Sequence, residues 1–195
     1  MNSNQTSSPS SASDTRCVLD DATRRCLLPI PSDRKALWDF YYKQRGCGWE
    51  AGEIRYGKKD ETDFQSLDEH QRRCVETVLA CCAVGASYVS DNLIGNFTGE
   101  VPAVEAQYNF GWQTQIEQVH AEAYARAIDF YVQDPERKKQ LFAMTGEIPA
   151  VKKKTTWIET YMNPDNATFG ERLVAFAIVE GVLFSGSFCA VYWLK

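Results

Sequence analysis

The sequence predicts an all-α protein, a single domain built as a bundle of long helices. Apolar residues recur every three or four positions over most of the chain, which is the spacing of one helix face. Patterns typical of strands are scarce. With 195 residues, of which 44% are hydrophobic, the chain is long enough to bury one core.

The first residues differ in composition from the rest of the chain. They are rich in Ser, Asn, Thr and Gln and lack the apolar stretch of a signal peptide. We therefore expect a disordered tail over residues 1–16 and one domain over residues 17–195.

The first helix is expected from about Asp33 to Gln44, after the extended segment Pro29-Ile30-Pro31. Its inner side should carry Leu37, Phe40 and Tyr41. A Gly-Cys-Gly loop then leads to Trp49.

The second helix is expected to open at Ser66, whose hydroxyl would cap the helix while Glu69 reaches back, as in a Ser-x-x-Glu capping box. Six apolar residues then follow at spacings of 4, 3, 4, 3 and 4, so all six should face the core. They are Val75, Leu79, Cys82, Ala86, Val89 and Leu93.

The third helix should be about 30 residues long. Pro102 suits its first turn, and the helical pattern continues to Tyr131. Two shorter helices are expected next, one from Asp134-Pro135 to about Gly146 and one over residues 151–162.

Thr168 and Glu171 form a second capping box, which should open a last helix from Leu173 to Leu194. This stretch has 22 residues and one charge, Glu180, so a membrane anchor is an alternative. A buried bundle helix is favoured, because a charged residue near the centre of a membrane helix costs on the order of 3 kcal/mol. The other apolar stripes also need a partner.

The formal net charge of -5 and the pI near 5.1 argue against a nucleic-acid binder, which needs a clustered basic face. Seven cysteines without a Cys-x-x-Cys pair indicate neither a disulfide framework nor a zinc site. Reduced thiols in a cytoplasmic protein are the simplest interpretation.

The most informative motif is Glu-x-x-His-x-x-x-Tyr, formed by Glu117, His120 and Tyr124. On a helix, steps of three and four return to the same face, so the three side chains should share one wall. Glu-x-x-His is half of the ligand set that four-helix bundles use for di-iron and di-manganese centres. Glu180, a lone carboxylate in an apolar helix, would need a cation too. The alternative is an ordinary core histidine beside a surface glutamate.

Several stretches resemble the small subunit of class I ribonucleotide reductase, and the resemblance covers roughly residues 25–195. The most specific stretches are residues 169–188 with 192–195, and residues 116–124; residues 150–154 and Asp134-Pro135 support them. The resemblance implies a ferritin-like fold and a di-iron centre that generates a tyrosyl radical for the reduction of ribonucleotides to deoxyribonucleotides.

The resemblance also implies roles for individual residues. Glu117, His120 and Glu180 match iron ligands, and Tyr124 matches the radical tyrosine. The apolar wall around the radical would come from Phe184 and Phe188, and Trp49 would be the near end of the electron path to the large subunit.

Departures from the family pattern affect the metal site. The position of the first aspartate ligand is Ala86, on the predicted inner face, and Ser87 and Asp91 lie too far round the helix to replace it. A second Glu-x-x-His helix and the C-terminal tail that docks on the large subunit are not found before Lys195, and His70 reads as a surface residue.

Two main functions follow. The first is a ribonucleotide reductase small subunit that is not competent alone, with at most a partial iron site. The alternative is a non-catalytic paralogue that pairs with an intact small subunit. We expect a homodimer or such a heterodimer, because the apolar face of residues 173–194 should be partly exposed. A membrane-anchored helical protein is third.

Overall fold

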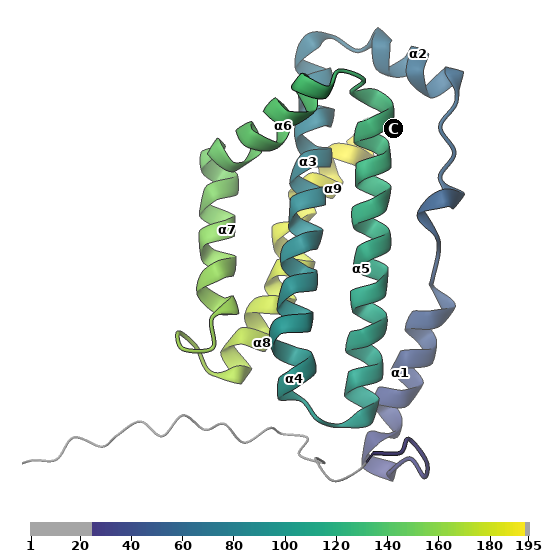
Figure 1. The fold of residues 1–195 in the computed structure, drawn as a ribbon, viewed down its shortest axis with the longest axis vertical. Helices are drawn as coiled ribbons and strands as arrows, with labels where there is room; N and C mark the ends of the chain where they lie inside the picture. Colours follow the sequence, from purple (N-terminus) through teal and green to yellow (C-terminus); the bar gives the residue numbers. More distant parts are fainter. Residues whose placement is uncertain (1–24, 194–195) are drawn as a thin grey trace, which may run out of the picture.

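The computed structural model describes residues 25–193, and every regular element in that range is helical, as predicted. Two long helices, α3 (Glu69–Asn92) and α5 (Val104–Tyr131), lie antiparallel and side by side at the centre (Figure 1). The other helices surround this pair. The tail predicted over residues 1–16 lies outside the described residues.

The first helix forms close to its predicted position, as a 3-10 turn (Ser32–Arg34) followed by α1 (Lys35–Gly46). It packs along the first half of α5 (Figure 1). Leu37 and Tyr41 are half-buried, whereas Phe40 is 55% exposed, so its predicted inner position was wrong. The buried stripe continues from Leu37 and Tyr41 to Gln44, which donates to Asn109 Oδ1 at 2.9 Å, and Phe40 lies beside it.

A short helix that the sequence analysis missed, α2 (Lys58–Ser66), follows the 3-10 turn Ala51–Glu53. Ser66 ends α2 rather than opening α3, and its hydroxyl donates to the Asp63 carbonyl at 2.7 Å. The N-cap of α3 is Asp68, which accepts from the Gln71 amide at 2.9 Å in a capping box of its own. The predicted box was therefore displaced by two residues.

The apolar stripe of α3 faces inward as predicted. Cys82, Ala86, Val89 and Leu93 are buried, and the first two residues of the stripe are half-buried. After α3 the chain continues through a π-helical segment (Leu93–Phe97) and one more turn, α4 (Thr98–Glu100).

Helix α5 begins after Ala103, so Pro102 precedes the helix and does not lie in its first turn. Helices α6 (Pro135–Glu147) and α7 (Pro149–Met162) then return along the far side of α3 (Figure 1). Asp134 caps α6 by accepting from the Glu136 amide at 3.0 Å, as predicted.

The last segment is not one continuous helix. Thr168 caps α8 (Phe169–Ile178) in the predicted capping box. A π-helical segment (Val179–Leu183) and a turn at Phe184 separate α8 from α9 (Ser185–Trp193).

In this α8–α9 arm, one side of α8 and of the π-helical segment is buried, whereas no residue of α9 is buried, so the predicted buried bundle helix is confirmed only for the first part of the arm. Arg172, Ala175, Phe176 and Val179 face the core. The outer side exposes large apolar side chains, as expected for residues 173–194: Leu173, Val174, Ile178, Val182, Phe188, Val191, Tyr192 and Trp193.

The first half of the arm is held by an aromatic cluster. The Phe97 ring, which is fully buried, lies 5.2 Å from the ring of Phe176 and 5.9 Å from those of Phe110 and Phe169. This cluster joins the π-helical segment Leu93–Phe97 to α5 and α8. It brings Glu180 of the segment after α8 up to α5.

Within residues 25–193, two stretches are long and apolar enough to cross a membrane, Glu69–Glu100 and Phe169–Trp193. Core helices of soluble proteins pass the same test of length and composition. The membrane alternative is therefore neither supported nor removed by this property.

Candidate functional site

The motif on α5 forms one wall, as its spacing predicts. Glu117 is buried, with 8% of its surface exposed, and its Oε1 lies 3.2 Å from His120 Nδ1. Tyr124, one turn further along, is half-buried. The hydrogen bond between Glu117 and His120 is the chief cause of a raised pKa of His120, while partial burial opposes the rise.

Trp49 lies beside this wall. Its ring centroid is 5.8 Å from that of His120, with 34° between the ring planes. The preceding Gly48 allows this approach, since a Cβ there would lie 2.8 Å from the Trp112 ring. The structure thus brings Trp49 to the motif, although the two are some 70 residues apart in the chain.

Glu180 faces the same wall from the arm. Its Oε1 accepts a hydrogen bond from Gln113 Nε2 at 3.2 Å, and Gln113 lies one turn before Glu117 on α5. Burial raises the pKa of Glu180 to about 7, and the negative charge of Glu117 adds to the rise. Glu180 lies in a π-helical segment, a distortion found frequently at functional sites.

Tyr124 interacts with a thiol that the sequence analysis did not single out. Burial is the chief cause that raises the pKa of Tyr124 to about 12, and the neighbouring Cys82 adds to the rise. Cys82 of α3 is 2% exposed; burial raises its pKa, and hydrogen bonding to Ser187 and Tyr124 opposes the rise. The one sequence feature that could have pointed to Cys82 is its place on the apolar stripe, one turn before Ala86.

The two phenylalanines proposed for the radical wall lie in different surroundings. Phe184 packs against Gly85 so closely that a Cβ at Gly85 would lie 2.2 Å from its Cε1. Phe188 is 44% exposed, and its ring centroid is 6.4 Å from that of Phe184. Their roles next to Tyr124 stay a prediction.

Ala86 occupies the place where the resemblance expects an aspartate. It is 4% exposed and faces the core. The neighbouring Ser87 and Asp91 are exposed, so neither replaces the missing carboxylate. His70, in the first turn of α3, is exposed as predicted.

The residues present do not fit a two-iron centre. Between residues 25 and 193, no three His, Cys, Asp or Glu side chains group so that they could hold a metal ion. Glu117 is paired with His120 and Glu180 with Gln113, and the methyl group of Ala86 supplies no ligand. These two contacts hold Glu117, His120, Gln113 and Glu180 together in one polar cluster.

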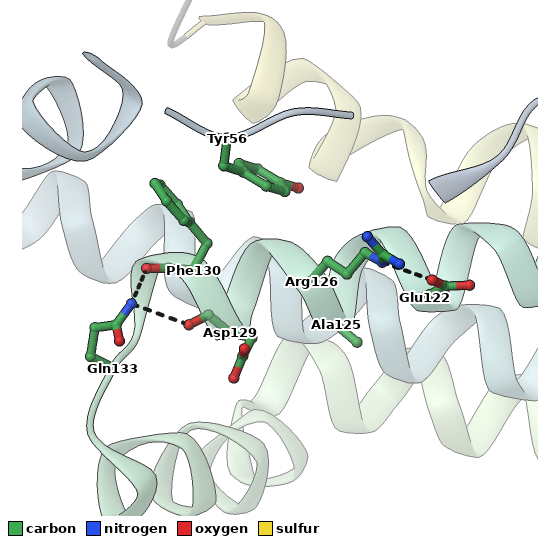
Figure 2. A pocket seen from close by; sticks show the side chains of 7 residues that line it. All are labelled: Tyr56, Glu122, Ala125, Arg126, Asp129, Phe130 and Gln133. Carbon is green, nitrogen blue, oxygen red and sulfur yellow. Dashed lines mark hydrogen bonds and ion pairs between the residues drawn. The ribbon is translucent and has the colours of Figure 1, made fainter. Parts of the chain in front are cut away.

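An open depression of about 620 Å³ lies elsewhere on α5, on its outer face (Figure 2). Tyr56 stacks on Phe130 there at 4.9 Å, and Arg126 pairs with Glu122 at 2.7 Å (Figure 2). Because these charges are already paired, we assign it no function.

Comparisons with known proteins agree with the fold and the motifs. The family model for the ribonucleotide reductase small chain matches residues 27–195. The ribonucleoside-diphosphate reductase small chain of Spisula solidissima is 36% identical over 178 residues, covering 91% of this chain and 46% of that protein. Subunit M2 of the human enzyme is 37% identical, covering 91% and 45%. The Plasmodium falciparum small subunit is 41% identical, covering 88% and 55%.

Solved structures show the same architecture. The ribonucleotide reductase Rnr4 homodimer from Saccharomyces cerevisiae matches with a TM-score of 0.74 and 32% identity, covering 89% of this chain and 54% of that one. The R2 subunit from Clostridium botulinum matches in fold, with a TM-score of 0.69 and 23% identity, covering 81% and 50%. The chain spans about half the length of the relatives it matches. The helical bundle is therefore the ferritin-like fold of these subunits, and the chain belongs to the family of class I ribonucleotide reductase small subunits.

Proposed function

We propose that this chain serves a cytoplasmic ribonucleoside-diphosphate reductase as a small-subunit component that does not generate a tyrosyl radical by itself. The observation that carries the proposal is Ala86, a buried methyl group on the inner face of α3 where the resemblance expects an aspartate. The polar cluster supports it, since Glu117 pairs with His120 and Glu180 accepts a hydrogen bond from Gln113.

In this function the residues of the motif hold the interior of the bundle together. Glu117 and His120 pair on α5, and Gln113 links α5 to Glu180 on the arm. Trp49 covers His120. These contacts orient the arm without requiring a metal ion, while at most one weakly held divalent ion could use the same oxygens and imidazole.

Metal analysis tests the proposal directly. The purified chain is supplied with ferrous iron and oxygen, its iron content is measured, and electron paramagnetic resonance is recorded. We expect less than one iron per chain and no tyrosyl signal. Two irons per chain, with a radical signal that disappears in Tyr124→Phe, would overturn the proposal.

A second candidate is a non-catalytic paralogue that pairs with an intact small subunit and stabilises or limits it. Ala86 favours this function specifically, because the ligand is lost inside an otherwise regular helix. Co-expression with an intact small subunit tests it. A heterodimer should form in preference to either homodimer, and separate elution of the two chains would reject this candidate.

A further inference from the structure

A small cavity lies on the side of α3 that faces α7, away from the polar cluster. Its volume is about 130 Å³, and its walls come from α3, α7 and the junction between the π-helical segment and α9. Large apolar side chains contribute to the lining: Val84, Val151, Ile158, Leu183 and Phe184. An apolar cavity of about 150 Å³ in another protein binds benzene, so this volume suits one aromatic ring.

Lys154 of α7 supplies positive charge at the rim of the cavity. Its Nζ donates to the Leu183 carbonyl at 2.6 Å, and an ammonium group has three donors, so two remain. Lys154 forms no ion pair with any carboxylate that the structure describes within residues 25–193.

The charge of Lys154 also reaches the α3 wall. Burial raises the pKa of the Cys81 thiol, and the positive charge of Lys154 opposes this rise. Glu159, the carboxylate one turn further along α7, accepts from the Tyr88 hydroxyl at 2.8 Å. The rim therefore offers a cation with free donors, and the interior offers an apolar slot.

We propose that this cavity binds a single-ring aromatic carboxylate, for which benzoate is the simplest probe. The ring occupies the space between Val84 and Phe184, and the carboxylate pairs with Lys154. The proposal does not rest on the proposed function, because neither Glu117, His120 nor Glu180 lines the cavity.

The first test changes the charge. Benzoate and phenol, a neutral ring of similar size, are each titrated into the full chain and followed by ligand-observed NMR and calorimetry. Lys154→Met should weaken benzoate binding about 10- to 100-fold, the effect of a lost charged hydrogen bond, and leave phenol binding within about threefold. Lys153 is also exposed but lies outside the lining, so Lys153→Met should change the binding of neither benzoate nor phenol.

The second test changes the volume. Thr155 lines the cavity, so Thr155→Leu should reduce the binding of both benzoate and phenol at least about tenfold. Thr156→Leu is the matched control, since Thr156 is exposed and lies outside the lining. Lys154→Arg keeps the charge and should retain benzoate binding, which separates loss of the site from loss of folding.

Either of two results would overturn the proposal. The first is the absence of saturable benzoate binding at millimolar concentration. The second is saturable binding that neither Lys154→Met nor Thr155→Leu weakens, since the anion would then occupy another part of the surface.

Discussion

Helices α3 and α5 lie against each other along most of their length, yet they contribute differently to the interior. The inner face of α5 carries a carboxylate, an imidazole and a phenol, whereas the facing stripe of α3 carries Cys82, Ala86 and Val89. Both helices contribute side chains to the contact surface, but the carboxylate, the imidazole and the phenol all come from α5.

The difference shows how polar and apolar side chains are each accommodated in the interior. A buried carboxylate needs a partner, and Glu117 has one in His120, while Tyr124 interacts with Cys82. Ala86 needs no partner, since a methyl group packs against α5 without polar atoms to satisfy. The packing of the two helices therefore does not require a carboxylate at position 86.

The largest effect is expected when the carboxylate is put back. Ala86→Asp places an unpaired charge at a position that is 4% exposed, so the free energy of unfolding should fall by about 3–5 kcal/mol in metal-free protein. Chemical denaturation at neutral pH measures the loss. Manganese or ferrous ion should recover part of it, because ligand binding to the folded state adds stability.

Ser87→Asp is the matched control on the next residue of α3. Ser87 is exposed, so its substitution should change stability by no more than about 0.5 kcal/mol, with or without metal. An equal loss at both positions would show that position 86 is not more buried than position 87.

The next effect concerns the close contact of α3 with the arm. Gly85→Ala would place a Cβ 2.2 Å from Phe184 Cε1, and such overpacking costs about 1–3 kcal/mol. The better helix propensity of Ala offsets up to about 1 kcal/mol, so a net loss of about 0.5–2 kcal/mol is expected in thermal or urea unfolding.

Gly111 of α5 provides the corresponding position on the other helix. A Cβ at Gly111 meets nothing within 4 Å, so Gly111→Ala should stabilise the protein by up to about 1 kcal/mol. If both substitutions stabilise the protein, then Phe184 moves away from α3 without cost, and its proposed place in an apolar wall loses support.

Features that depend on local geometry could be predicted from the sequence. The inner face of α3 follows from its spacing, and Asp134 and Thr168 cap helices because their side chains reach amides two or three residues ahead. The prediction of Ser66 as the cap was wrong because Asp68, two residues further along the chain, accepts the hydrogen bond from the Gln71 amide instead.

The interactions between helices could not be predicted in the same way. The π-helical segment around Glu180 has no reliable local signal, since one extra residue in a turn is stabilised by its surroundings. The contact of Tyr124 with Cys82 depends on how α3 and α5 are rotated about their axes. The sequence therefore identified the groups on α5 but not the partners they have in this structure.

A smaller effect tests that contact. Tyr124→Phe removes the hydroxyl and keeps the ring, so the free energy of unfolding should fall by about 0.5–1.5 kcal/mol, the usual value for one hydrogen bond. Tyr42→Phe, at a site that is 55% exposed, should change it by less than about 0.5 kcal/mol. Equal losses of stability in the two variants would mean that the Tyr124 hydroxyl gains no stabilising hydrogen bond from Cys82.

The smallest effect is expected at the histidine on α3. His70 lies in the first turn of that helix, exposed and at the opposite end from the buried stripe, so His70→Ala should change stability by no more than about 0.5 kcal/mol. The same substitution at His120 removes the partner of the buried Glu117 and should cost more. Bound metal is measured by mass spectrometry after incubation with manganese. The amount that the wild-type chain retains should be unchanged by His70→Ala and reduced by His120→Ala. A loss of bound metal with His70→Ala would place a ligand on α3 after all, and the contrast between the two helices would no longer hold.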